Sequence, residues 1–167
     1  MTLLDASFDG SRANPIDRLE QIVSTNQWPF ERFGDDEMAF SIGGMQAQYH
    51  LWFGWNRKMR SLELRCAIDV TVPKRRYSEM AEVLARINFE LWMGHFDSNP
   101  DEPGIVFRHT LFSGGADGLQ FAELEMIVDV ALTTCERCYP AFMLLLWGGQ
   151  KPEDAVAAAI LETIGEA

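Results

Sequence analysis

Two of the three cysteines, Cys135 and Cys138, stand at the Cys-x-x-Cys spacing that serves redox centres and zinc sites. In a thioredoxin-type centre the pair lies at the N-terminus of a helix, where the helix dipole lowers the pKa of the first thiol. Here the pair follows about four turns of a predicted helix. Glu136 lies between the two cysteines, and Cys135 continues an apolar stripe. These features favour packing over redox chemistry.

A structural zinc site needs four ligands, of which this pair would supply two. Cys66 lies on the apolar side of a predicted strand, and the three histidines are scattered over strands without a paired spacing. We therefore interpret Cys66 and Cys135 as small core residues. A redox or zinc site at Cys135 and Cys138 is the less favoured alternative, and we expect no cofactor and no metal.

Catalytic motifs are absent from the rest of the sequence. It contains no G-x-S-x-G, no H-E-x-x-H and no Rossmann glycine fingerprint. Its carboxylates show no spacing that would mark an acid–base pair. The sequence therefore predicts a protein that is not an enzyme.

The periodicity of apolar residues predicts the elements that carry these side chains. Helical spacing predicts helices at about 15–26, from Pro73 towards Gly94, from about 119 to 147, and at 151–165. Pro140 is expected to kink or split the third of these helices. Strands are predicted at 30–33, 38–42, 47–55, 62–72, 95–97 and 105–112. The segment 62–72 alternates strictly between apolar and polar residues, so one face of its sheet is buried and the other is solvated, as in antiparallel sheets.

The predicted order α-β-β-β-β-α-β-β-α-α defines an α+β fold, in which helices pack against one antiparallel sheet. A length of 167 residues suits one core. We expect residues 1–14 to form a loose N-terminal arm and residues 15–167 to form a single domain, with Asn14 as the N-cap of the first helix.

Charge excludes several kinds of partner. The net charge of −11 disfavours binding to nucleic acid and to anionic membranes. The N-terminal residues do not read as a secretory signal, and the longest apolar stretch, Ala141–Trp147, is too short to span a bilayer. We expect a cytoplasmic protein. Two basic clusters, Arg57–Arg60 and Lys74–Arg76, are separated by a strand and do not form one patch.

Aromatic residues are numerous, with five tryptophans and eleven phenylalanines, and such side chains are enriched in protein interfaces. Trp52 falls on the opposite face of its strand from Tyr49 and Leu51. The segment from Tyr139 to Trp147 is apolar nearly all round, which predicts burial on more than one side. The candidate protein-binding or dimer surface comprises Trp52, Trp55, Phe142 and Trp147.

Two segments resemble the YbjN family of putative bacterial sensory transduction regulators. They are "NFELWMGHF" at Asn88–Phe96 and "YPAFMLLLWGGQKPEDA" at Tyr139–Ala155, and the resemblance extends from about Pro15 to the C-terminus. It implies a fold similar to type III secretion chaperones, which often dimerise. It implies no enzymatic activity and supplies no catalytic residues.

These observations together predict a non-catalytic, cytoplasmic regulatory or chaperone-like domain that binds a protein partner and forms a homodimer. A sensor with a small-ligand pocket between sheet and helices is the main alternative, and a Cys-x-x-Cys redox or zinc protein is a further one.

Overall fold

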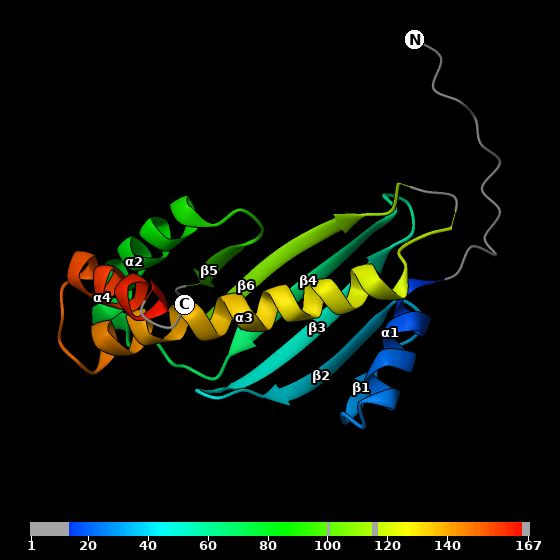
Figure 1. Ribbon diagram of the computed structural model, residues 1–167, viewed down its shortest axis with the longest axis horizontal. Coiled ribbons are helices and arrows are strands. Elements are labelled where there is room, and N and C mark those ends of the chain that lie inside the picture. The colour runs from blue at the N-terminus through cyan, green and yellow to red at the C-terminus, as the bar shows by residue number, and fades with distance from the viewer. Residues whose placement is uncertain (1–13, 100, 115–116, 165–167) are drawn as a thin grey trace, which may run out of the picture.

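The computed structural model describes residues 14–99, 101–114 and 117–164, with side chains up to Ala159 (Figure 1). The predicted arm therefore lies outside the described residues, apart from Asn14. The predicted order of elements is confirmed. The elements are α1 (Pro15–Thr25), β1 (Phe30–Arg32), β2 (Glu37–Gly43), β3 (Gln48–Asn56), β4 (Ser61–Ile68), a short 3₁₀ turn (Lys74–Arg76), α2 (Tyr77–Glu90), β5 (His95–Asn99), β6 (Glu102–Phe112), α3 (Phe121–Leu146) and α4 (Pro152–Ile164).

All six strands form one antiparallel sheet in the order β1-β2-β3-β4-β6-β5. Alternate residues along the central strands are buried, as the period of two requires. The long helix α3 crosses the buried face in Figure 1, and α1 lies beside it over the first strands. We call the other face, which none of the described helices covers, the open face. The predicted α+β class is therefore correct.

Two predicted boundaries on either side of Pro73 differ from the structure. The strand predicted to reach Val72 ends at Ile68, although Val72 is still buried. The helix predicted from Pro73 begins with the 3₁₀ turn, and α2 itself starts at Tyr77. Cations are unfavourable at a helix start, but one of the three in this turn has a partner outside it. The Arg76 guanidinium donates to the carbonyl of Leu145, in the last turn of α3.

Pro140 does not split α3, which runs unbroken from Phe121 to Leu146. Proline has no N–H, so the carbonyl of Glu136 loses its helical donor. The side chain of Gln46, in the turn between β2 and β3, donates to that carbonyl at 3.3 Å. The Glu136 carboxylate in turn accepts the backbone N–H of Met45 at 2.8 Å. Of the two outcomes expected at Pro140, a kink or a split, the split is therefore wrong, and a neighbouring turn supplies a donor to the freed carbonyl.

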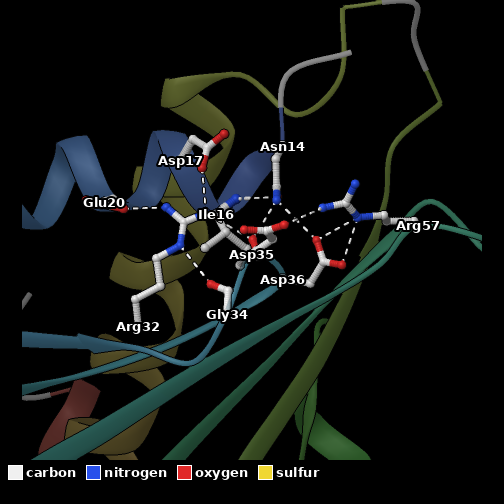
Figure 2. A network of polar contacts seen from close by, with 9 residues as sticks. All are labelled: Asn14, Ile16, Asp17, Glu20, Arg32, Gly34, Asp35, Asp36 and Arg57. Atoms are coloured by element: carbon white, nitrogen blue, oxygen red, sulfur yellow. Dashed lines mark hydrogen bonds and ion pairs between the residues drawn. The ribbon is translucent and has the colours of Figure 1, made fainter. Parts of the chain in front are cut away.

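A polar network attaches α1 to the turn between β1 and β2 (Figure 2). Asn14 caps α1 by accepting the N–H of Ile16 at 3.0 Å, which confirms the predicted N-cap. Its amide also donates to the carbonyl of Asp35 at 2.6 Å. Arg32 donates to Asp17 of α1 at 2.6 Å, and Arg57 pairs with the turn carboxylate of Asp36 at 2.7 Å. These bonds hold the start of α1 against the turn between β1 and β2, so this network has a structural role.

The segment Asn88–Phe96 also has a structural explanation. The Asn88 side chain donates to the carbonyl of Phe96 at 2.9 Å and accepts its N–H at 2.7 Å, which fixes β5 against the end of α2. Between them, Gly94 adopts φ +67°. A Cβ at Gly94 would lie 2.3 Å from the ring of Phe107 and 2.8 Å from the carbonyl of Arg108. Only glycine suits both the conformation and the space.

Candidate protein-binding face of the sheet

The open face is organised around Trp52. In the register of the sheet, Ala39 of β2 lies beside Trp52 of β3, which lies beside Arg65 of β4. The Arg65 guanidinium stacks over the Trp52 ring at 4.9 Å from its centroid, a cation–π geometry. Gly54 lies two residues further along β3, and a Cβ there would come within 2.3 Å of the indole. The indole therefore lies flat on the backbone and is held in place from the other side by Arg65.

A hollow of about 670 Å³ extends over this face. Its central wall is the Trp52–Arg65 pair, and its floor includes the small side chains of Ala39, Ser41 and Ala67. His50 lies at its margin, with Nδ1 2.8 Å from the Ser41 hydroxyl. The hollow therefore combines an aromatic surface, a cation and a polar ring nitrogen.

An ion network borders the hollow. Glu63 accepts hydrogen bonds from Arg65 at 2.8 Å and from Arg108 at 2.9 Å, and Arg108 also reaches Asp97 at 3.4 Å. The bond from Arg65 is the main reason that the pKa of Glu63 lies below its ordinary value, and Arg108 adds to the effect. The carboxylate of Glu63 therefore fixes the direction of the Arg65 side chain that covers Trp52.

We expect Glu63→Gln to lower the free energy of unfolding at pH 7 by at most about 1 kcal/mol, because the three side chains are partly exposed. A carboxyl with a lowered pKa in the folded state contributes stability above its unfolded pKa and loses it as the pH falls through the folded pKa. The difference between variant and wild type should therefore shrink towards about pH 3. Urea denaturation at both pH values measures it, and an unchanged difference would contradict the assignment.

The four predicted surface residues do not come together. Trp52 lies on the open face, as predicted, and is partly exposed. Trp55 is turned to the opposite face and packs against the core. Phe142 is fully buried, so its predicted place on a binding surface is wrong. Its side chain points from α3 towards β5, and its ring centroid lies 5.4 Å from that of Phe96. Trp147 follows the end of α3 and is 79% exposed, on a different element from Trp52 and Trp55 of β3.

A second group of exposed apolar side chains was not predicted from the sequence. Trp92 is fully exposed, Phe89 and Phe112 are largely exposed, and Met93 is partly exposed. The helix predicted from Pro73 was expected to continue towards Gly94. The prediction therefore did not include the change in chain direction after Glu90, where α2 ends. The unusual cluster of large apolar residues around Trp92 was the available signal.

Cys66 and Cys135 are core residues, as predicted, and Cys138 is buried as well. Cys66, Cys135 and Cys138 are all free and buried, and the sulfur atoms of Cys66 and Cys135 are 3.8 Å apart. Hydrogen bonding to Cys66 and burial raise the pKa of Cys135 far above its ordinary value, and burial raises that of Cys138 to about 11. Both thiols are therefore protonated at neutral pH.

Over residues 14–99, 101–114 and 117–164, no group of three or more His, Cys, Asp or Glu side chains is arranged to hold a metal ion. In the same part of the chain, none of the helices combines the length and the apolar character needed to cross a membrane.

The chain belongs to the YbjN family. The profile of that family, described as "Putative bacterial sensory transduction regulator", matches residues 15–143. The family is thus described as regulatory and not as enzymatic. A solved structure, "Crystal structure of YbjN, a putative transcription regulator from E. coli", is similar over 90% of this chain and 92% of that chain, with 13% identity and a TM-score of 0.49. A search of the curated proteins finds no match.

Proposed function

We propose that this protein is a non-catalytic regulatory domain that binds a segment of a partner protein on the open face of its sheet. The observation that carries the proposal is the 670 Å³ hollow around the stacked Trp52–Arg65 pair on the open face. The regulatory description of the family supports it. A chaperone-like mode of action in the cytoplasm and a homodimeric state belong to the same proposal.

The geometry of Trp52 suits recognition of another protein. A tryptophan ring offers a large apolar area, and tryptophan is enriched among the residues that dominate binding energies. Because the indole rests on Gly54 under Arg65, little side-chain freedom is left to lose on binding. The neighbouring His50 and Arg65 supply polar groups that give direction to the contact.

Site-specific photocrosslinking tests the proposal. A photoreactive amino acid replaces His50, which is exposed at the margin of the hollow, and in a matched control it replaces Ser24, which is exposed on α1. In the native cells, we expect a crosslinked protein of defined mass at position 50 and none at position 24. Adding Trp52→Ala should reduce the yield about tenfold or more. Equal products at both positions, or no product at position 50, would contradict the proposal.

The alternative of a small-ligand pocket between sheet and helices gains no support from three hollows that are lined by described residues. Besides the hollow on the open face, one lies along α3 and one between α2 and α4. None of these three lies between the sheet and the helices.

A further inference from the structure

The hollow between α2 and α4 has features that the open face does not explain. It has a volume of about 570 Å³ and is lined by one side of α2 and by the first two turns of α4. The two helices contact each other near one end of α3 (Figure 1). Most of the lining side chains are exposed, so the hollow opens to solvent. We call it the α2–α4 groove.

The middle of the α2–α4 groove is apolar. Val156 is buried and forms its floor, and the small side chains of Ala85 on α2 and Ala157 on α4 lie to either side. Phe89, four residues after Ala85 and therefore on the same side of α2, is 87% exposed. An exposed aromatic ring beside small neighbours leaves room for an apolar side chain of another molecule.

The apolar surface continues along the chain at the end of α2. Trp92 is fully exposed and Met93 is partly exposed, and both follow Phe89 closely in the sequence. Large exposed apolar side chains scattered singly are ordinary on a protein surface, but a group of them is typical of a contact with another protein. This end of α2 therefore indicates a second contact surface, separate from Trp52.

Carboxylates surround the apolar middle of the α2–α4 groove. Glu82 and Glu90 of α2 and Glu153 of α4 line it, against one cation, Arg86. Arg86 is already paired with Glu82 at 2.7 Å. Glu90 and Glu153 have no ion pair with any other described residue. The groove thus offers two carboxylates that a cationic partner can meet.

We propose that the α2–α4 groove binds an amphipathic helix of a partner protein, whose apolar stripe is flanked by lysine or arginine. An apolar side chain of this helix lies over Val156 beside Phe89, and the flanking cations meet Glu90 and Glu153. This site is separate from the open face, so the proposal does not depend on the function assigned to that face.

The walls of the groove favour a helix over an extended segment. Both walls are helices, whose backbone groups are bonded internally, so an extended segment finds no strand edge to pair with. A helical segment satisfies its own backbone hydrogen bonds and presents apolar anchors at helical spacing. The small side chains of Ala85 and Ala157 let a third helix approach α2 and α4 closely.

Charge selects a cationic partner over a second copy of this chain. A second copy carries the same net charge of −11 and is repelled. A cationic helix is attracted to the carboxylates around the groove, which speeds association and excludes acidic segments. The apolar middle then supplies the affinity, as hydrophobic anchors do in helix-binding grooves.

Fluorescence anisotropy with a defined peptide tests the proposal. The probe is a labelled peptide of about 18 residues, long enough to form a helix, with leucines on one face and lysines on the other. One control peptide has glutamate in place of every lysine, and a second has the same composition as the probe in scrambled order. We expect the purified protein to bind the probe at least about tenfold more tightly than either control peptide.

Variants of the protein locate the binding. Ala157→Trp fills the groove, whereas Ser24→Trp places the same ring on the exposed side of α1. Glu90→Lys reverses a charge at the groove, and Asp69→Lys makes the same change in net charge at an exposed position after β4. We expect Ala157→Trp and Glu90→Lys to raise the Kd of the probe about tenfold or more, and their controls to change it less than about twofold. Circular dichroism checks that all four variants fold.

Three results would overturn the proposal: no binding of the probe, equal binding of the glutamate peptide, or an unchanged Kd in Ala157→Trp and Glu90→Lys. Trp52→Ala is expected to leave the Kd unchanged, because Trp52 lies on the open face. Loss of probe binding in Trp52→Ala would place the peptide on the open face and would also overturn this proposal. Crosslinking at position 50 tests the open face separately, so the two proposals can fail independently.

Discussion

Replacing Phe142 with alanine should lower the free energy of unfolding by about 3–5 kcal/mol. The ring is fully buried under α3 and meets Phe96 of β5 edge to face, with the ring centroids 5.4 Å apart. Removing it leaves a cavity where the long helix contacts an outer strand, a site that cannot collapse without moving one of the two elements. Urea denaturation followed by tryptophan fluorescence measures the loss.

Trp147→Ala is the matched control for this prediction. Trp147 comes from the same apolar segment but is 79% exposed, so its removal should change stability by about 0.5 kcal/mol or less. If both variants had similarly small effects, Phe142 would not be a core residue, and its interpretation as part of a binding surface would return.

Gly94→Ala should lower the free energy of unfolding by about 3 kcal/mol. Positive φ costs an alanine about 1–2 kcal/mol, and Gly94 has φ +67°. Its new Cβ would also lie 2.8 Å from the backbone carbonyl of Arg108 and 2.3 Å from the ring of Phe107, so the start of β5 would have to shift. Thermal and urea denaturation both measure this effect.

Gly34→Ala separates the two causes. Gly34 has φ +73°, but a Cβ there would meet nothing within 4 Å. We expect this variant to cost about 1 kcal/mol, the contribution of conformation alone. Equal losses at Gly34 and Gly94 would show that the close approach to Phe107 and Arg108 has no energetic weight.

The order of elements could be predicted because it depends on local periodicity. The alternation in β4 and the helical stripe of α2 state which residues face the core, and each pattern is long enough to be unambiguous. The behaviour of Pro140 could not be predicted in this way. Its missing donor is replaced by Gln46, a residue about 90 positions away in the sequence, and only the fold brings the two together.

The candidate site could be predicted only in part, because only part of it depends on local periodicity. The face of the sheet on which Trp52 lies follows from its position within β3. Its stacking under Arg65 depends on the register between β3 and β4, which the turn between them determines. Phe142 was misplaced because a helix that is apolar nearly all round does not show which of its sides faces outwards. Trp92 was missed because the exit from α2 depends on the close contact of Gly94 with Phe107.

The burial of all three thiols makes them internal reporters of global motion. Neither Cys66 nor Cys135 can meet a water-soluble alkylating reagent while α3 rests on the sheet. These thiols can therefore be labelled only when α3 separates from the sheet. The rate of labelling under native conditions measures how often the core opens. Mass spectrometry of alkylated protein would count these openings without any denaturant.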